Sequence, residues 1–444
     1  MKIKIFSLVC LALFANVSQA YKLSESAELH GFISQGYIYS PDNYFSGKDS
    51  NTGSFNFREF GLNAFWEASQ KLRFAGQLLS RTQDESADGS LKIDFLLADY
   101  KVYQSVDSDF GVRIGRTKNA FGLYNETRDI PSARTSISVP NAIYFNSFRD
   151  VVLATDGLNV YGQHIINSGS LSWNAFTGGR QNDSPELEYY MFGQQIEGAY
   201  DPLALKGLKL EYVPNSKHNL KFAFSLLDVN ATLEDAQSVT AANSALSSSS
   251  PVTDAAAYAI GVLGYTYGDS NFNSYVGAAA QNEAKNNYTA YLTASELNSL
   301  FVVLSMQYGV GDWLFSAEYM DIYTRLMSEV LGNKTIVHAT SSGFALQVEW
   351  FTSWDTQLFA RYEELYFIDN DRSGLVSARP NDAYHGFGKG ISLGAKWYLD
   401  ESWALTGEVA INKGTAWLPV YAGIENTKMS EHWSTYSLNV SYQF

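Results

Sequence analysis

Hydrophobic and polar residues alternate with a period of two along many short segments of this 444-residue chain. In the final segment, "STYSLNVSYQF" (434–444), the apolar parity holds Tyr436, Leu438, Val440, Tyr442 and Phe444. The same alternation recurs in 71–81, 342–351, 391–399 and 403–412. This period is typical of β-strands that have one apolar and one polar face. The sequence therefore predicts an all-β protein, although a soluble β-sandwich shows the same alternation in any single strand.

The connections between these segments alternate between short and long. Short links are predicted near 69–70, 105–107, 167–169, 215–219, 269–270, 310–311, 353 and 400–401. Long ones are predicted near 41–53, 82–89, 117–152, 180–205, 231–255, 284–298, 327–339, 369–387 and 414–431. Tight turns at one end and long loops at the other are typical of outer-membrane β-barrels. Nine long and eight short connections predict a transmembrane antiparallel barrel of about eighteen strands, with sixteen as the alternative.

The first twenty residues have the pattern of a secretory signal peptide. Lys2 and Lys4 precede an apolar stretch, and the small residues Ser18 and Ala20 precede the expected cleavage site. A membrane-spanning helix needs about 20 apolar residues, more than this stretch offers. We therefore predict a signal peptide over 1–20 and a barrel over 21–444, exported through the periplasm to the outer membrane of a Gram-negative cell. The first strand begins so soon after the cleavage site that no plug domain is expected before it.

Charge narrows the range of partners. The chain has 31 basic and 46 acidic residues, a formal net charge of −15, which becomes −17 without Lys2 and Lys4. An acidic protein is a poor partner for nucleic acid, so none is predicted. Aromatic residues make up 15% of the chain, which suits two belts at membrane–water interfaces.

No catalytic or metal-binding motif appears in the sequence. The six histidines show neither an HExxH motif nor a close pair at ligand spacing, and they are His30, His164, His218, His338, His385 and His432. The only cysteine, Cys10, lies in the predicted signal peptide. We therefore predict that the protein is not an enzyme and that it uses no metal or cofactor.

The last strand is predicted to pair with the first, "AELHGFISQGYIY" (27–39). A strand edge exposed to lipid leaves backbone groups without hydrogen bonds, so the barrel must close. A terminal Phe after alternating apolar residues also resembles the signal that the barrel-assembly machinery recognises. The residues that carry this assembly signal are Tyr436, Leu438, Val440, Tyr442 and Phe444. The resemblance implies that this machinery is a partner and that outer-membrane lipid and lipopolysaccharide surround the wall.

The third long connection, 117–152, differs from the other loops. Pro131 and Pro140 stiffen it, and several aromatic residues make disorder unfavourable. Its first part, "RIGRTKNAFGLYNETRD" (113–129), resembles the "R-x-G-Q-x-K-x-P-F-G-L-E" signature of phosphate-selective (O/P-type) porins and their relatives. The matching residues are Arg113, Gly115, Lys118, Phe121, Gly122 and Leu123.

This resemblance implies an outer-membrane porin whose third loop folds into the lumen and constricts a water-filled channel for passive diffusion. It also implies a homotrimer. Arg116, Ala120 and Tyr124 depart from the signature, which puts the phosphate specificity in doubt.

Charge reverses locally in this loop, because six basic residues between Arg113 and Arg149 face only two acidic ones. A cluster of positive charge in a narrow pore raises the local anion concentration. We therefore predict a pore constriction that favours small hydrophilic or anionic solutes, formed by Arg113, Arg116, Lys118, Glu126, Arg128, Asp129, Arg134 and Arg149. Two alternatives remain at this point. The arginines could pair with acidic wall residues and only anchor the loop, or the barrel could be structural or adhesive, without a dedicated solute.

Overall fold

The computed structural model describes residues 21–47, 49–83, 87–181, 203–240, 289–330, 333–375, 382–419 and 428–444. These residues form seventeen β-strands and four short helical segments between β6 and β7. The strands are β1 (Tyr21–Ser24), β2 (Ala27–Tyr39), β3 (Ser54–Glu67), β4 (Leu72–Thr82), β5 (Asp88–Gln104), β6 (Ser108–Lys118), β7 (Ala154–Ile166), β8 (Gly169–Arg180), β9 (Leu203–Pro214), β10 (Asn219–Thr240), β11 (Thr289–Val310), β12 (Trp313–Val330), β13 (Asn333–Phe351), β14 (Thr356–Tyr366), β15 (Phe387–Tyr398), β16 (Trp403–Gly414) and β17 (His432–Gln443).

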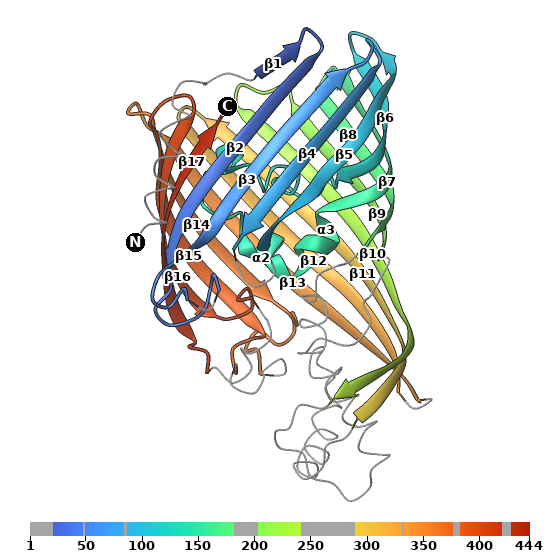
Figure 1. The fold of residues 1–444 in the computed structure, drawn as a ribbon, viewed down its shortest axis with the longest axis vertical. Coiled ribbons are helices and arrows are strands. Elements are labelled where there is room, and N and C mark those ends of the chain that lie inside the picture. Colours follow the sequence, from blue (N-terminus) through green and yellow to red (C-terminus); the bar gives the residue numbers. More distant parts are fainter. Residues whose placement is uncertain are drawn as a thin grey trace, which may run out of the picture.

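Sixteen of these strands, β2 to β17, close an antiparallel barrel (Figure 1). Each pairs with its neighbours in sequence, and β17 pairs with β2 from Tyr436↔Tyr39 to Gln443↔Phe32. The additional strand β1 forms a small hairpin with β2. The predicted pairing of the last strand with 27–39 is therefore confirmed, and no lipid-facing edge remains between β17 and β2.

The sixteen-strand alternative is confirmed, and the first count of eighteen strands is too high. The two extra strands came from a hairpin predicted around Asp269–Ser270, which lies outside the described residues. Strands β10 and β11 pair directly from Asn219↔Gly309 to Thr240↔Thr289. β10 and β11 are therefore direct neighbours in the ring of strands.

Most of the predicted short links are observed, but three predicted long loops differ from the structure. Residues 231–240 of the loop expected at 231–255 belong to β10, and residues 289–298 of the loop expected at 284–298 belong to β11. Strand β12 runs to Val330 and β13 begins at Asn333, with these two residues paired, so the long connection expected at 327–339 is wrong. Polar residues such as Ser328 and Thr335 suggested a loop, but they continue the strand pairing as partners of each other. At the opposite end, Val310 pairs with Trp313 across a two-residue turn in which Gly311 has a φ of 55°. Glycine adopts this left-handed conformation at little cost.

The outer and inner faces follow the predicted alternation. On β15 and β16, Leu393 is 57% exposed and Val409 is 42% exposed, whereas Ser392 and Glu408 on the other face are buried. Apolar residues exposed on the outside are those that meet lipid, and the polar face points into the barrel. The interior must therefore contain something that covers Ser392 and Glu408.

Replacing Val409 with Arg should lower the free energy of unfolding by about 2–4 kcal/mol, because a charge in the middle of the lipid face loses its hydration. The measurement is urea unfolding of the barrel in lipid vesicles. Ser172→Arg is the matched control, because Ser172 lies on the inner face opposite Glu211. Equal destabilisation by the two substitutions would contradict the assignment of the faces.

Candidate functional site in the barrel interior

The connection from β6 to β7 folds into the barrel, as predicted for the third long loop. It carries the short helical segments η1 (Pro131–Ala133), α2 (Asn141–Tyr144), η2 (Asn146–Phe148) and α3 (Arg149–Val152). Figure 1 shows α2 and α3 inside the ring of strands. Pro131 occupies the start of η1 and Pro140 precedes α2, positions where a missing backbone N–H costs no helical hydrogen bond. We refer to residues 119–153 as the inner loop.

One side of the inner loop is apolar and packs on an apolar part of the inner wall. The Phe148 ring lies 5.6 Å from that of Phe301 on β11, and the Phe121 ring lies 6.1 Å from it. Other loop residues in this core are Ile143, Tyr144, Phe145, Val151 and Val152, and the wall contributes Leu205, Leu227, Val229, Val303, Met320 and Ile322. This packing places the loop firmly against β9 to β12.

Carboxylates of the inner wall hold the other parts of the loop. Glu318 on β12 accepts a hydrogen bond from the Leu123 N–H at 2.9 Å and another from the Tyr144 hydroxyl at 2.9 Å. Burial and the Glu318 carboxylate raise the pKa of Tyr144 well above its usual value, so its hydroxyl remains a donor.

The same arrangement recurs on the next strands. Glu363 on β14 accepts from the Ala142 N–H at 3.0 Å, and Glu408 on β16 accepts from the Ile137 N–H at 2.9 Å. Glu349 on β13 accepts from the Thr135 hydroxyl at 2.9 Å. Carboxylates of the wall therefore accept hydrogen bonds from loop N–H and O–H groups, including the Ala142 N–H in the first turn of α2, where helical N–H groups lack a partner within the helix.

Two buried cations of the wall bind loop carbonyls and hydroxyls. Lys396 on β15 donates to the carbonyls of Pro131, Ser132 and Arg134 at 2.9, 3.2 and 2.7 Å. Arg361 on β14 donates to the Ser136 hydroxyl at 2.8 Å and to the Ser138 carbonyl at 2.9 Å. Arg361 also lies 3.3 Å from both Glu363 and Glu408. Segment 131–138 is thus fixed across the interior.

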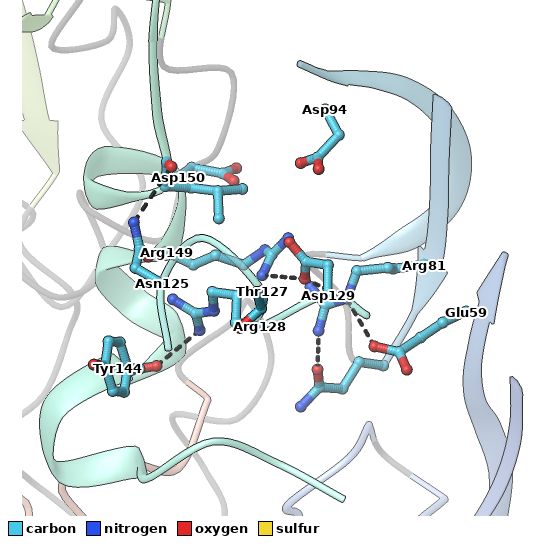
Figure 2. Close-up of polar contacts among 12 residues, drawn as sticks. Glu59, Arg81, Asp94, Asn125, Thr127, Arg128, Asp129, Tyr144, Arg149 and Asp150 are labelled. Carbon is cyan, nitrogen blue, oxygen red and sulfur yellow. Dashed lines mark hydrogen bonds and ion pairs between the residues drawn. The ribbon is translucent and has the colours of Figure 1, made fainter. Parts of the chain in front are cut away.

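A buried ion-pair cluster attaches the loop to Glu59 on β3, Arg81 on β4 and Lys118 on β6. Asp129 lies 2.8 Å from Arg149 and 3.8 Å from Arg81 (Figure 2). It also lies 2.8 Å from Lys118. Burial alone would raise the pKa of Asp129, but Arg149, Lys118 and Arg81 together hold it well below its usual range. The Asp129 carboxylate is therefore ionised throughout the physiological pH range.

The remaining members of the cluster are Glu59, Asp94, Arg134 and Arg128. Arg134 forms a bidentate pair with Glu59, and Lys118 lies 2.7 Å from Asp94. Arg128 donates only to the Tyr144 carbonyl, at 2.8 Å, and no carboxylate pairs with it among the described residues. Burial and the neighbouring Arg149 lower the pKa of Arg128 to about 9. The five cations of this cluster meet three carboxylates, so positive charge is in excess.

Five of the eight predicted constriction residues lie in this cluster: Lys118, Arg128, Asp129, Arg134 and Arg149. Glu126 is separate, with its side chain 43% exposed and 3.6 Å from Lys209 on β9. Arg113 lies on the inner wall but is paired with Asp99 at 3.0 Å and stacked on the Tyr161 ring.

Arg116 does not belong to the constriction. It shares its face of the sheet with Leu96, which is 57% exposed on the outside of the barrel, and it pairs with Asp156 at 2.7 Å. The correction has a simple cause. Arg113 and Arg116 are three positions apart on one strand, so they have opposite parity and point to opposite faces.

The sequence interpretation missed the wall residues that hold the loop. They are Glu59, Arg81, Glu318, Glu349, Arg361, Glu363, Lys396 and Glu408. The sequence did contain a sign of them, because the alternation places each of these charged residues on the inner face of its strand. Period two identified the face, but it could not show that the loop covers it.

Every strand of the ring has at least one buried residue on its inner face. One such residue for each strand from β2 to β17 is Ser34, Glu59, Gln77, Asp94, Thr117, Asn159, Phe176, Leu205, Leu227, Phe301, Glu318, Glu349, Glu363, Lys396, Glu408 and Asn439. On β3 and on β12 to β16, several of these residues bond directly to the inner loop.

No helix in the described part of the chain is long and apolar enough to cross a membrane. Within the same residues, no three His, Cys, Asp or Glu side chains are grouped so that they could hold a metal ion.

Comparisons with known proteins identify the fold. No family model matches the chain, and no curated protein matches it in sequence. The anion-selective porin of Comamonas acidovorans is 12% identical, with 94% of this chain and 99% of that chain covered and a TM-score of 0.52. OprB of Pseudomonas putida is 9% identical, with 94% of each chain covered and a TM-score of 0.51. OmpT of Vibrio cholerae, described as an outer-membrane protein, is 10% identical, with 96% and 100% coverage and a TM-score of 0.51.

Proposed function

We propose that this chain, which has the fold of outer-membrane porins, forms an outer-membrane channel for small hydrophilic solutes whose conductance is set by the inner loop. The observation that carries this proposal is the closed ring of sixteen strands with an apolar outer wall and a loop folded across its interior. A barrel of this size encloses a lumen wide enough for solutes when the loop leaves space.

The excess positive charge of the ion-pair cluster supports an anion preference. Arg128 has no carboxylate partner among the described residues, so its charge is the least compensated of the cluster. Fixed charge in a weakly screened interior attracts counter-ions and repels ions of the same sign. The other loop cations are paired and act mainly as anchors.

Replacing Arg128 with Gln should shift the reversal potential toward cations in a KCl gradient, because one uncompensated positive charge is lost. The measurement is planar-bilayer recording of wild type and variant at low salt, and the shift should shrink in concentrated KCl. The matched control is Arg116→Gln, which removes a charge on the outer face. An equal effect of both substitutions, or none at low salt, contradicts the role of Arg128.

The expected surroundings follow from this proposal. The barrel inserts in the outer membrane through the assembly machinery, and lipid and lipopolysaccharide contact its outer wall. A homotrimer is also expected, and OmpT of Vibrio cholerae has been solved in a trimer form, with a TM-score of 0.50 to this chain. The transported solute is a small hydrophilic or anionic molecule.

A second candidate function is a structural or adhesive barrel without a dedicated solute. It is favoured by one observation, the presence of at least one buried inner-face residue on each of the sixteen strands. The two functions differ in the conductance of the full chain. A channel conducts under at least one physiological condition, whereas a structural barrel stays silent under all of them, and both should conduct when residues 122–150 are replaced by a short Gly-Ser linker.

A further inference from the structure

Two hollows lie along the same strands on the outer side of the barrel. The larger has a volume of about 530 Å³. This volume is within the range of small-molecule sites, about 300–1,000 Å³. We call it the outer groove. Its outward-facing lining residues come from β9 to β12 and include Leu210, Phe222, Leu304, Met306, Ala317 and Tyr319.

A small residue opens the outer groove. Ala317 lies between Phe315 and Tyr319 on the outer face of β12, because residues two positions apart on a strand share a face. Its strand partners are Met306 on β11 and Leu346 on β13. The methyl side chain of Ala317 leaves space between these four larger neighbours, which are all apolar or aromatic. The outer groove is therefore suited to hydrocarbon.

The smaller hollow has a volume of about 340 Å³ and lies at the end of the same strands. We call it the end pocket. Lys217 and His218 line it from the turn before β10, and Gly311 lines it from the turn between β11 and β12. Trp313 and Phe351 complete one side. A Cβ atom added at Gly311 would meet no atom of the described residues within 4 Å, so the pocket reaches the backbone there.

The end pocket is positively charged. Lys217 is exposed and forms no ion pair with the described residues, and none of the described residues that line the pocket is a carboxylate. The ring of His218 lies 5.5 Å from that of Tyr308. A phosphate group is an anion that a lysine ammonium and an imidazole N–H can both bind.

The end pocket lies at the level of a membrane–water interface. The stacked rings of Trp313 and Trp350, 5.5 Å apart, lie beside it on β12 and β13, and tryptophan is enriched at such interfaces. Val310 pairs with Trp313 across a two-residue turn, and the tight turns of outer-membrane barrels lie on the periplasmic side. The adjoining leaflet is therefore the inner one.

One strand connects the two hollows. Met306 on β11 lines the outer groove, and Val310 on the same strand lines the end pocket. Four residues of a strand span about 14 Å. Tyr308 lies between them on the outer face. An apolar groove and a cationic pocket at this separation fit a ligand with a hydrocarbon part and an anionic head.

We propose that the outer groove and the end pocket together bind one glycerophospholipid of the inner leaflet. An acyl chain lies in the groove, and the phosphate contacts Lys217 and His218. The free cation favours a lipid over a second copy of this chain, because an apolar outer wall brings no counter-ion to Lys217. The inference does not depend on conduction by the barrel.

The test is the binding of dioleoyl phosphatidylglycerol to the purified, heat-modifiable barrel in detergent, followed by native mass spectrometry. Wild type should retain one lipid and bind it much more tightly than dioleoylglycerol, which has the same chains without the phosphate. K217Q/H218Q should weaken binding about tenfold, the loss expected for a charge-assisted hydrogen bond. The matched control is K71Q, because Lys71 is an exposed lysine in the tight turn between β3 and β4.

A second variant tests the groove. A317F fills the hollow and should weaken binding at least about tenfold, because each methylene kept from apolar contact costs about 0.8 kcal/mol. Its control is A98F, because Ala98 lies on the outer face of β5, two positions from the exposed Leu96.

Four outcomes overturn the proposal. Equal binding of dioleoylglycerol, or an equal loss in K71Q and K217Q/H218Q, shows that the end pocket does not recognise phosphate. Full binding by A317F shows that the groove does not hold the chain. Disulfide cross-linking of A317C between two copies in the outer membrane, in a mature chain expected to have no other cysteine, shows that a second copy occupies the groove.

Discussion

Replacing Tyr442 and Phe444 with Ser should remove nearly all folded protein from the outer membrane. Phe444 exchanges two backbone hydrogen bonds with Gly31, at 3.0 and 3.1 Å, and its ring lies over the Gly31 Cα, where even a Cβ atom would be only 2.5 Å away. The Tyr442 ring packs against Trp403 at 4.8 Å. The Phe444 contacts lie where the last strand meets β2, and the Tyr442 contact joins the last strand to β16. The substitution therefore weakens closure of the barrel and also removes the expected assembly signal.

The measurement is the heat-modifiable band in outer-membrane fractions of cells that express each variant. Trp397→Ser is the matched control, because it removes an exposed aromatic residue from the outer face of β15 and leaves the closing strand intact. Wild-type amounts of the folded double variant would refute the role of the terminus. The assembly signal at Tyr436, Leu438, Val440, Tyr442 and Phe444 stays a prediction until this is done.

Replacing Asp129 with Asn should detach the side of the inner loop that the ion-pair cluster holds. Asp129 is 2% exposed, and Lys118, Arg149 and Arg81 all point at its carboxylate. Removing one partner of a buried ion pair costs about 3–5 kcal/mol, because the remaining charges stay buried without compensation. The cluster already has excess positive charge, so the loss of the Asp129 charge increases the repulsion among its cations. The loop lowers this repulsion by moving away from β3, β4 and β6.

The measurement is hydrogen exchange of residues 119–153 together with conductance at neutral pH. Both should rise strongly in the Asp129 variant. The matched control is Asp156→Asn, which breaks an exposed pair with Arg116 on the outer wall, and exposed pairs contribute about 0–1 kcal/mol. Unchanged exchange in the Asp129 variant would show that the apolar packing alone holds the loop.

The sequence by itself determined the features that depend on neighbours along the chain. Period two placed Leu393 and Val409 on the lipid side and Ser392 and Glu408 on the inside, and the exposure of these residues confirms it. The closure of 27–39 with the last strand followed from the need to satisfy backbone groups in lipid. The aromatic residues of the third loop indicated order, and its resemblance to the third loop of porins implied that it enters the lumen, where the structure places it.

Only the tertiary structure decided which residues of that surface hold the loop. Leu123 and Glu318 are 195 positions apart, and no local pattern relates them. The same limit applies to charge, since a buried anchoring arginine and a free pore arginine read identically in sequence. Arg134 anchors the loop because Glu59 lies opposite it and pairs with it. Arg128 keeps uncompensated charge because no carboxylate among the described residues pairs with it. Strand alternation is a local consequence of backbone geometry, whereas the state of the interior depends on how distant strands close around one loop.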